Sequence, residues 1–445
     1  MTDQSTIFAP ASGFGRAAVA VVRLSGPACA AVLRALAGPL PPPRRLSLRS
    51  LRDPADGAVL DKALVCWMPG PRTFSGEDMA ELHLHGGAAV RASVLRVLSG
   101  LPGCRAAEAG AFTRRAVLNG CMDLTEAEGI ADLIEAETEA QRRQALRQLD
   151  GALGRQVEAW REEALACLAA TEAALDFADE GDVDDAALDA ALAARVAHLR
   201  AGIASALADD RRGERLRDGF TVVLAGAPNV GKSTLLNALS RRDAAIVSDR
   251  PGTTRDAIEV RLDLGGLPVL LVDTAGLRET EDAVESEGIA RTRRRIAQAD
   301  LVLFLADNGT QEDGPQEDAG NFGVPVVRVR TKADLCGDAA PRDLQEIRIS
   351  ARTGLGLETL LRTVQERAES AMGGGDAVVT RERHREALTR CLGHLDRVLA
   401  AADGALPELV GEDLRLAVRA LGEVSGRVGI EDVLDRLFGS FCIGK

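Results

Sequence analysis

The sequence predicts a mixed α/β protein in which a doubly wound P-loop domain is inserted into a helical domain that follows an N-terminal α+β domain. Three observations support this prediction. Short apolar runs typical of strands occur within residues 1–119. Residues 120–216 and 376–445 are instead rich in Ala, Leu, Glu and Arg, with apolar residues at helical spacing. Between them, residues 217–371 contain an apolar strand, a phosphate-binding loop and a helix in succession. Both ends of this insert are expected to meet the same helical body.

The N-terminal α+β domain is predicted from three runs with the length and composition of strands, at residues 19–24, 62–67 and 79–84. Proline-containing loops separate them. The helical domain that follows is predicted from a stripe of apolar side chains that starts at Leu124 and recurs every three or four residues. Helical patterning continues from there to about Leu216.

The composition limits the class of protein. The chain has 445 residues, 46% of them hydrophobic, and no run approaches the ~20 consecutive apolar residues of a membrane helix. The first residues have neither the basic region nor the apolar region of a secretory signal. The eight cysteines show no metal-ligand spacing, which is typical of reduced thiols. We therefore expect a cytoplasmic protein with no membrane association.

Residues Gly226 to Ser233 have the spacing of a phosphate-binding loop. The apolar segment 221–225 precedes the loop as a strand, and a helix is predicted to follow it. Glycines let backbone N–H groups approach phosphate oxygens closely. Lys232 is expected to reach the β- and γ-phosphates, and the Ser233 hydroxyl to bind Mg²⁺.

A second set of residues is expected around the γ-phosphate. Asp273 ends the apolar strand 269–272, where a carboxylate suits a water-mediated contact with Mg²⁺. The N–H group of Gly276 is placed to sense the γ-phosphate. Between the two loops, the hydroxyl-rich segment 251–256 contains Thr254, the candidate for the second protein ligand of Mg²⁺.

The base-binding end is predicted from Thr331-Lys-Ala-Asp334, which follows the strand 326–330. The Asp334 carboxylate can accept hydrogen bonds from N1 and N2 of guanine, which adenine cannot donate. Ser350-Ala-Arg352 fits the last base-contacting loop. Thr331 stands where the guanine motif usually has Asn, and its hydroxyl is shorter and lacks the amide NH₂. We therefore expect weaker nucleotide affinity, with guanine selectivity retained through Asp334.

Together these motifs predict a GTP-binding domain with the nucleotide at the carboxyl ends of the strands. The residues expected to contact GTP are Gly226, Asn229, Val230, Gly231, Lys232, Ser233, Thr234, Ser248, Asp249, Arg250, Pro251, Gly252, Thr253, Thr254, Asp273, Thr274, Ala275, Gly276, Thr331, Lys332, Ala333, Asp334, Ser350, Ala351 and Arg352.

Three further blocks of sequence lie outside the GTP-binding part. They are 6–26, 74–87 with its Glu-Leu-His-Leu-His-Gly-Gly stretch, and the C-terminal Phe441-Cys-Ile-Gly-Lys445. With these blocks the chain resembles, over essentially its whole length, the MnmE (also called TrmE) family of tRNA modification GTPases. The C-terminal block is highly specific for that family.

The resemblance implies that K⁺ activates GTP hydrolysis. The implied K⁺ ligands are the Asn229 side-chain oxygen, backbone oxygens of Ser248 and Arg250, and Thr253. A cation there neutralises charge that develops during phosphoryl transfer, as an arginine would. Asn229 can instead be a loop residue that stabilises its own turn. Arg255 is the alternative to K⁺, as an arginine finger in cis. The implied catalytic residues are Glu285, which orients the attacking water, with Asn229 and Lys232.

The resemblance also implies that the N-terminal domain mediates dimerisation and binds a 5-formyl- or 5,10-methylene-tetrahydrofolate. Its implied contacts are Arg23, Glu81, Cys121 and Lys445. Taken alone, Arg23 and Glu81 are ordinary strand residues that would pair with neighbours. Cys121 stands where the family usually has Lys, so folate binding is expected to be weaker unless Arg114 or Arg115 supplies the charge. Cys442 is a candidate reactive thiol, or else an apolar anchor of the tail.

The implied function is a homodimeric GTPase that works as a heterotetramer with an FAD-containing partner, MnmG. Together they would add a carboxymethylaminomethyl or aminomethyl group at C5 of the wobble uridine of certain tRNAs. FAD and NADH would act through the partner, with glycine or ammonium as the amine donor. Because the net charge is −13, RNA binding needs either local basic patches or contacts shared with a partner. The basic runs 291–295 and 381–385 are candidates, although such runs are usually solvated helix faces. Two alternative functions remain open. One is a regulatory or ribosome-assembly GTPase that binds RNA without modifying it, and the other is a folate enzyme of one-carbon metabolism with an appended regulatory switch.

Overall fold

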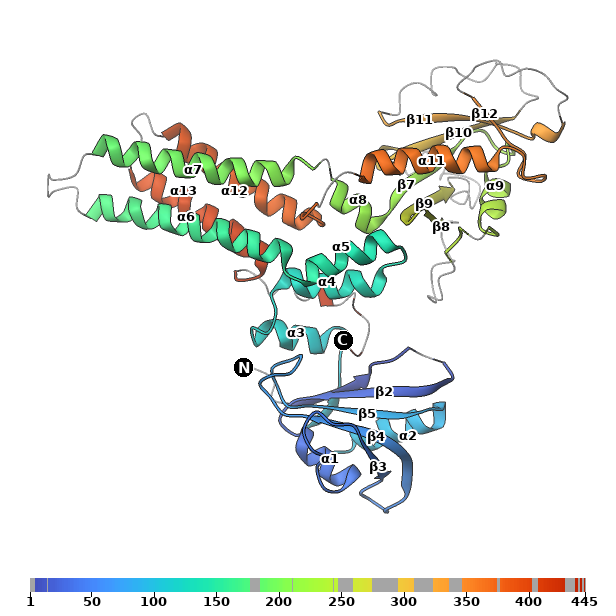
Figure 1. Ribbon diagram of the computed structural model, residues 1–445, viewed down its shortest axis with the longest axis vertical. Coiled ribbons are helices and arrows are strands. Elements are labelled where there is room, and N and C mark those ends of the chain that lie inside the picture. The colour runs from blue at the N-terminus through green and yellow to red at the C-terminus, as the bar shows by residue number, and fades with distance from the viewer. Residues whose placement is uncertain are drawn as a thin grey trace, which may run out of the picture. The chain divides into compact units, whose positions relative to one another are not determined.

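The computed structural model describes residues 5–13, 15–176, 185–209, 211–242, 244–246, 259–273, 295–307, 323–335, 346–373, 377–401, 407–428, 437–438, 441 and 444. The chain divides into two compact units (Figure 1). The N-terminal unit contains residues 1–131, 154–161 and 419–445. The G-domain unit contains residues 132–153 and 162–418.

The N-terminal unit is built on a six-stranded sheet with the order β3-β4-β5-β2-β1-β6. Its strands are β1 (Thr6–Pro10), β2 (Ala17–Ser25), β3 (Ser47–Arg52), β4 (Val59–Met68), β5 (Met79–Gly86) and β6 (Cys104–Ala106). The three predicted strands are confirmed as parts of β2, β4 and β5. All pairs are antiparallel except β1 with β6.

One face of this sheet packs against α1 (Cys29–Ala37) and α2 (Ala88–Ser99). Alternate strand residues such as Val22, Leu24 and Leu82 are buried in the core with Leu33 of α1. Because strand side chains alternate between faces, the intervening residues lie on the opposite face. That opposite face carries Arg23 of β2 together with Glu81, His83 and His85 of β5.

The described remainder of the N-terminal unit is mostly helical. It contains α3 (Ala111–Leu118), most of α4 (Leu124–Glu135) and the first part of α6 (Ala152–Asp176). Leu124 and Ala127 of α4 form a small core with Phe438 and Phe441. The two phenylalanine rings make an edge-to-face contact with 5.1 Å between centroids. Phe438 and Phe441 are therefore packed into this unit.

The G-domain unit contains the second six-stranded sheet, in the order β12-β11-β10-β7-β9-β8. Its strands are β7 (Phe220–Ala225), β8 (Glu259–Leu264), β9 (Leu267–Asp273), β10 (Leu301–Asp307), β11 (Val326–Thr331) and β12 (Ile347–Arg348). All neighbours are parallel except β8 with β9. Helices α9 (Lys232–Leu239) and α11 (Leu357–Met372) and the 3₁₀ turn η2 (Ala333–Leu335) are described in the same part of the chain. The predicted doubly wound α/β fold is confirmed, because the parallel order reverses direction at β7.

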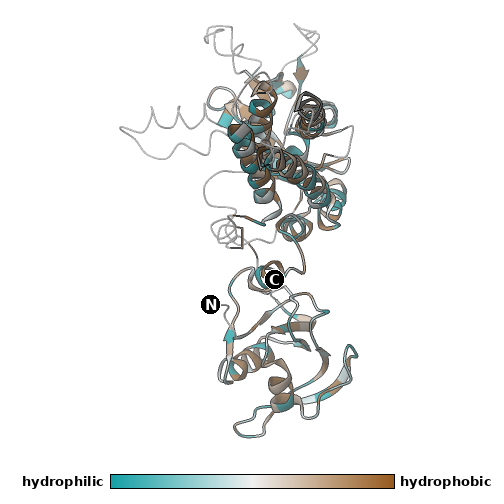
Figure 2. Cartoon of the chain, turned by 90° about the vertical axis from the view of Figure 1, so that its left-hand side faces the viewer, coloured by the Kyte–Doolittle hydropathy of each residue, from teal (hydrophilic) through white to brown (hydrophobic). Residues whose placement is uncertain are grey.

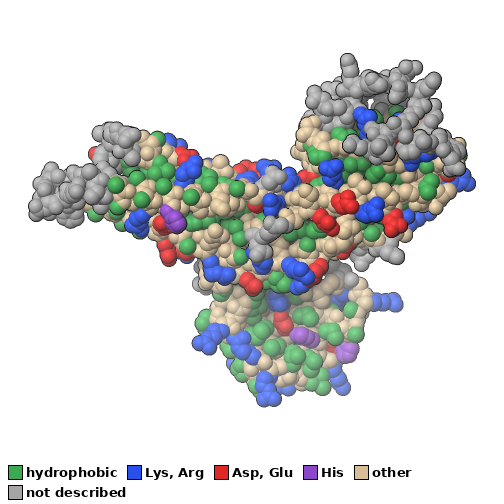
Figure 3. Space-filling model, turned by 45° about the horizontal axis from the view of Figure 1, so that its top comes forward, with side chains coloured by type: hydrophobic (Ala, Val, Ile, Leu, Met, Phe, Trp, Pro, Cys, Tyr) green, Lys and Arg blue, Asp and Glu red, His purple; other side chains and the backbone are tan. Residues whose placement is uncertain are grey.

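Helices make up the rest of the G-domain unit. They are α5 (Glu139–Leu149), α7 (Asp185–Leu207), α8 (Arg212–Asp218), α12 (Glu382–Ala401), most of α13 (Pro407–Ser425) and the later part of α6. Helices α7 and α12 lie side by side (Figure 1). Hydrophobic and hydrophilic residues alternate along the helices (Figure 2), and charged side chains stand on their outer surfaces (Figure 3). None of the helices in the described ranges is long and apolar enough to cross a membrane.

The chain enters the G-domain sheet through α8 and leaves it through the segment 377–380, and these two connections are packed together. Gly213 of α8 lies against the carbonyl of Val379 so closely that a Cβ atom would overlap it. Asp132 forms ion pairs with Arg217 of α8 at 3.0 Å and with Arg381 at 2.6 Å. Both connections of the inserted domain therefore meet at one place, beside α5.

Candidate nucleotide-binding and N-terminal sites

The phosphate loop runs from the carboxyl end of β7 to the first turn of α9. Gly226 and Gly231 have φ values of +142° and +103°, in the region where only glycine is unstrained. A Cβ atom at Gly226 would also overlap the carbonyl oxygen of Leu305 in β10. Helix α9 has Gly231 as its N-cap and no side-chain cap, so the N–H groups of its first turn remain suited to an anion.

Lys232 and Ser233 of α9 lie in this loop and face the end of β9. The Lys232 ammonium group donates hydrogen bonds to the carbonyls of Gly226 and Ala227, both at 2.8 Å. The Ser233 hydroxyl donates to Oδ2 of Asp273 at 2.7 Å. Asp273 is fully buried and Lys232 is only 7% exposed. The three predicted side chains thus come together from two neighbouring strands, because parallel strands bring their carboxyl ends to the same edge.

Asn229 occupies the left-handed region of backbone conformation, with a φ of +63°. Asn tolerates this conformation better than most residues, so the loop geometry alone is one reason for an Asn here. Its side chain is exposed. The structure therefore leaves two roles for Asn229: to shape the loop and to supply an oxygen ligand to a cation.

Thr331 connects the phosphate loop to the base-binding end of the sheet. Its side-chain hydroxyl lies 2.5 Å from the carbonyl oxygen of Val230 and 3.3 Å from that of Ala306. Thr331 is only 4% exposed. Sequence reasoning considered only the amide that Thr331 lacks and missed this tether. A hydroxyl residue at the end of a strand that flanks the loop was the signal that could have indicated it.

Replacing Thr331 by Val is expected to loosen the phosphate loop. The change keeps the shape of the side chain but leaves the buried carbonyl group of Val230 without its donor, at a cost of about 1–3 kcal/mol. We expect weaker GDP binding and faster amide hydrogen exchange in residues 226–233. Thr331→Ser, which keeps the hydroxyl, is the matched control and should stay close to the wild type. Equal exchange in the Val variant and the wild type would contradict the tether.

The base-binding residues Asp334, Ser350 and Arg352 are brought together from two separate loops. A hydrogen bond from the Ser350 side chain, the backbone of Asp334 itself and the nearby Arg352 charge hold the pKa of the Asp334 carboxyl below its usual range. Ser350 is almost completely buried, and Asp334 is exposed at the surface. The Lys332 ammonium group pairs with Asp307 at 3.0 Å. An ionised, exposed carboxylate held in this way suits a ligand that offers two hydrogen-bond donors.

Val230, Thr234, Ala333 and Ala351 also lie within the described chain, in the same loops. The other residues predicted to contact nucleotide, metal or folate lie outside the described residues. They are Ser248, Asp249, Arg250, Pro251, Gly252, Thr253, Thr254, Thr274, Ala275, Gly276, Glu285, Cys442 and Lys445. The basic run 291–295 is described only at Arg295.

In the N-terminal unit, Arg23 and Glu81 form an ion pair with each other. Both the Nε and NH2 groups of Arg23 donate to Glu81 Oε1, at 3.2 and 3.0 Å. His83 lies 3.2 Å from the other carboxylate oxygen. The Arg23 guanidinium is also 5.6 Å from the centre of the Phe74 ring. The two side chains are 26% and 22% exposed, so the pair remains open to a ligand.

Cys121 is exposed and lies against the loop that carries Phe74. A Cβ atom at Gly76 of this loop would be 2.8 Å from the Cys121 sulfur. Arg115 does not supply the charge that Cys121 lacks. Its guanidinium donates to Glu77 at 2.9 Å and to the carbonyl of Ser5 at 2.7 Å, and its side chain is only 11% exposed.

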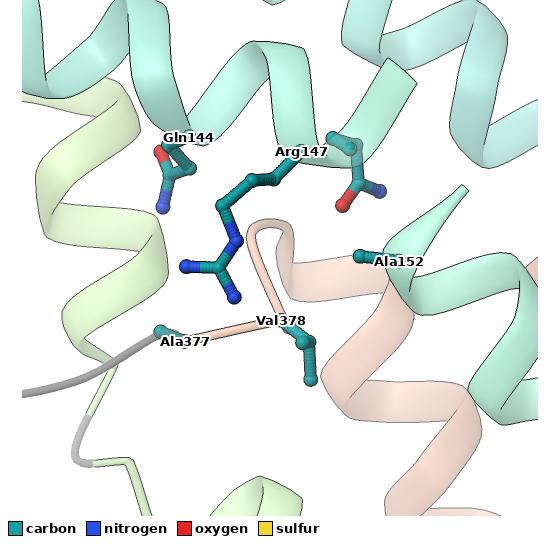
Figure 4. A pocket seen from close by; sticks show the side chains of 6 residues that line it. Gln144, Arg147, Ala152, Ala377 and Val378 are labelled. Carbon is teal, nitrogen blue, oxygen red and sulfur yellow. The ribbon is translucent and has the colours of Figure 1, made fainter. Parts of the chain in front are cut away.

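A small cavity lies in the G-domain unit where α5 meets the segment 377–378 (Figure 4). It is lined by Gln144, Arg147, Gln148, Ala152, Ala377 and Val378. Its volume of about 10 Å³ is room for about one water molecule. None of the predicted site residues lines this cavity, so it is not the nucleotide site.

Comparisons with known proteins cover the whole chain. Residues 124–442 match the family described as "MnmE helical domain", and residues 6–121 match the family described as "GTP-binding protein TrmE N-terminus". The chain is 70% identical over 446 residues to the "tRNA modification GTPase MnmE" of Methylobacterium radiotolerans, with 100% of both chains covered. It is also 70% identical over 450 residues to the protein of the same description from Methylorubrum populi, again with 100% of both covered.

Among solved structures, the chain is similar to Aquifex aeolicus Era Y63A bound to GDP·AlF4⁻, at 25% identity. That similarity covers 39% of this chain and 66% of the other, with a TM-score of 0.28, and no argument is based on it.

Proposed function

The chain belongs to the MnmE family of tRNA modification GTPases, and on that premise we propose that it is a K⁺-stimulated GTPase that acts on the wobble uridine of certain tRNAs. As a cytoplasmic homodimer with the FAD-containing partner MnmG, it adds a carboxymethylaminomethyl or aminomethyl group at C5. A tetrahydrofolate donates the carbon, and NADH acts through the partner. The observation that most supports the nucleotide chemistry is the convergence of Lys232, Ser233 and Asp273.

The phosphate loop fits GTP with Mg²⁺. The Ser233 hydroxyl and the Asp273 carboxylate, 2.7 Å apart, are the oxygen donors that Mg²⁺ prefers. Ser233 and Thr254 would hold the ion, which when bound neutralises charge on the β- and γ-phosphate oxygens. Lys232 adds a nearly buried positive charge, which acts strongly on phosphate because water screens it little. Asp334 would select guanine.

In this proposal K⁺ takes the place of an arginine finger, with Asn229, Ser248, Arg250 and Thr253 as its ligands. Glu285 orients the attacking water. Support within the described chain comes from Asn229 alone, whose exposed side chain projects from the phosphate loop. When bound, the ion stabilises the charge that develops between the β- and γ-phosphates.

For the folate we propose contacts from Arg23, Glu81, Cys121 and Lys445, with Cys442 as a nearby reactive thiol. The residues of the described part fit such a ligand. The partly exposed Arg23–Glu81 pair offers donors and acceptors beside the Phe74 ring, and a pterin has both a flat face and polar edges. Bound tetrahydrofolate would supply the one-carbon unit.

Tetrahydrofolate is expected to protect Cys121 from alkylation by iodoacetamide. Cys121 is exposed, so it should react first among the described cysteines. Cys391 is the internal control, because burial raises the pKa of its thiol to about 12 and keeps it protonated and unreactive. Peptide mass spectrometry should show modification of Cys121 slowed several-fold by the ligand. Identical alkylation rates with and without tetrahydrofolate would contradict a contact between Cys121 and the folate.

The proposed function as a whole is tested in a strain that lacks the gene. Mass spectrometry of its tRNA should show the modified wobble nucleoside replaced by its precursor. Wild-type protein should restore the modification, and Lys232→Ala should not. If the nucleoside is unchanged in the deletion strain, the proposal fails. The alternative, a regulatory or ribosome-assembly GTPase without modification chemistry, would then account for the P-loop domain.

A further inference from the structure

The N-terminal unit contains a long segment with positive charge only. Between Asp3 and Asp53 the sequence has no Asp or Glu, although the whole chain carries a net charge of −13. The same segment contains seven arginines, namely Arg16, Arg23, Arg34, Arg44, Arg45, Arg49 and Arg52. Such a separation of charge is typical of proteins that bind a polyanion.

The structure places several of these residues along one edge of the N-terminal sheet. Strand β3 is the edge strand, and the register sets its Ser50 opposite Lys62 of β4. Arg44 donates a hydrogen bond to the carbonyl of Arg72, which brings a further exposed arginine to the start of β3. Basic side chains stand out from the surface of this unit (Figure 3). We call this set of residues the basic edge: Arg44, Arg45, Arg49, Arg52, Lys62 and Arg72.

The charges of the basic edge are not neutralised. Within the described ranges, no carboxylate lies at ion-pair distance from any of its six side chains. Exposed arginines of the G-domain unit differ in this respect. Arg142 and Arg143 both pair with Glu139, at 2.7 and 2.8 Å, and Arg415 pairs with Glu172 at 2.9 Å. Five of the six residues of the basic edge are exposed and Arg49 is partly buried, so most of this charge faces solvent.

Protection of the edge strand is the simpler explanation for these residues. Charged side chains on an edge strand prevent it from pairing with another sheet. That explanation accounts for Arg49 and Arg52, which lie within β3. It does not account for Lys62 on β4 or Arg72 in the next loop, which extend the charge away from the strand edge.

We propose that the basic edge binds the phosphate backbone of tRNA, an inference that rests on the proposed function. The planar guanidinium group donates two hydrogen bonds to one phosphate, which favours arginine at such a surface. At about 3.3 Å per residue, the stretch from Arg45 to Arg52 spans roughly 23 Å, enough for several consecutive phosphates. Contacts of this kind position the RNA without reading its sequence.

The test measures binding of a fluorescent tRNA transcript to the full-length protein over a range of KCl concentrations. The variant carries Arg45→Gln, Arg49→Gln and Arg52→Gln together. The matched control carries Arg142→Gln, Arg143→Gln and Arg415→Gln, which removes the same charge from ion-paired positions. A third variant carries Arg45→Lys, Arg49→Lys and Arg52→Lys together and keeps the charge. GTP turnover without tRNA is measured for each as a check of folding.

Loss of three phosphate contacts should reduce the slope of log affinity against log salt by about 2 to 3, and the affinity at 0.1 M salt by roughly 100-fold. The control should bind like the wild type, and the Lys variant should keep most of the affinity.

Equal losses in the variant and the control, or no salt-dependent binding by the wild type, would overturn the inference. Weaker binding of the Gln variant to the partner subunit, with its tRNA affinity unchanged, would also overturn the inference. It would indicate that the basic edge binds an acidic protein. Failure of the proposed function is seen separately, as unchanged wobble nucleosides in the deletion strain.

Discussion

Replacement of Lys232 by Ala is expected to lower the turnover number for GTP by about 100- to 1000-fold, the usual cost of removing one group aimed at developing charge. Lys232 is nearly buried at the first turn of α9, next to the Ser233–Asp273 pair. Its charge is therefore poorly screened by water and acts on the phosphates where charge accumulates during hydrolysis. Steady-state phosphate release measures the effect.

Lys232 also has a structural role, because it bonds two carbonyl groups of the loop. Lys232→Gln separates the two roles, since its amide can still donate to a carbonyl but carries no charge. We expect this variant to turn over GTP as slowly as Lys232→Ala. Lys332→Ala is the control, because Lys332 pairs with Asp307 at the base-binding end and should affect KM more than kcat. GTP turnover by Lys232→Gln near the wild-type rate would show that the positive charge of Lys232 does not contribute to hydrolysis.

Replacement of Asp334 by Asn is expected to weaken GTP binding by about 100- to 10,000-fold. The estimate follows from two hydrogen bonds to a charged group, at about 1.5–3 kcal/mol each. Guanine offers two N–H donors to a carboxylate, whereas xanthine has a carbonyl oxygen in place of the amino group. The Asn amide can donate to that oxygen, so the variant should prefer xanthosine triphosphate. Competition binding with both nucleotides gives the result, and an unchanged preference for guanine would exclude Asp334 as the base-selecting residue.

The lowered pKa of Asp334 adds a pH dependence to this prediction. The carboxylate stays ionised at acid pH values where an ordinary Asp begins to take up a proton. GTP affinity should therefore hold through that range and fall only at lower pH. Ser350→Ala removes the largest stabilising contact, so the fall in affinity should shift to higher pH. A pH profile that is the same in both proteins would contradict the role of Ser350.

The nucleotide site could be predicted from the sequence because its motifs fix the backbone. Gly226 and Gly231 permit the positive φ values of the loop, and the parallel strands then bring Lys232, Ser233 and Asp273 to one edge. Loops far apart in the sequence, such as those of Asp334 and Ser350, meet for the same reason. Local chemistry and strand topology thus determine most of this site.

Contacts that depend on strand register or side-chain direction could not be predicted in the same way. The antiparallel pairing of β2 with β5 sets Arg23 opposite Glu81, so the two proposed folate contacts bind each other. The resemblance implies that each residue contacts the folate separately. The two residues taken alone predict only that each pairs with a neighbouring side chain. The tether from Thr331 to the loop carbonyl of Val230 spans 101 residues, and the sequence indicates it only by a hydroxyl residue at the end of a strand that flanks the loop.

The central claim, hydrolysis driven by a potassium ion, is tested most directly by GTP turnover in KCl and NaCl at equal ionic strength. Wild type is compared with Asn229→Gly and Asn229→Asp. Glycine accepts the positive φ of +63° at this position but removes the side-chain oxygen, whereas Asp keeps an oxygen. We expect strong stimulation by K⁺ in the wild type, its loss in Asn229→Gly and at least partial retention in Asn229→Asp. Slow and equal turnover of the wild type in both salts, or full stimulation of Asn229→Gly, would contradict the claim and leave Asn229 as a residue that only shapes the loop.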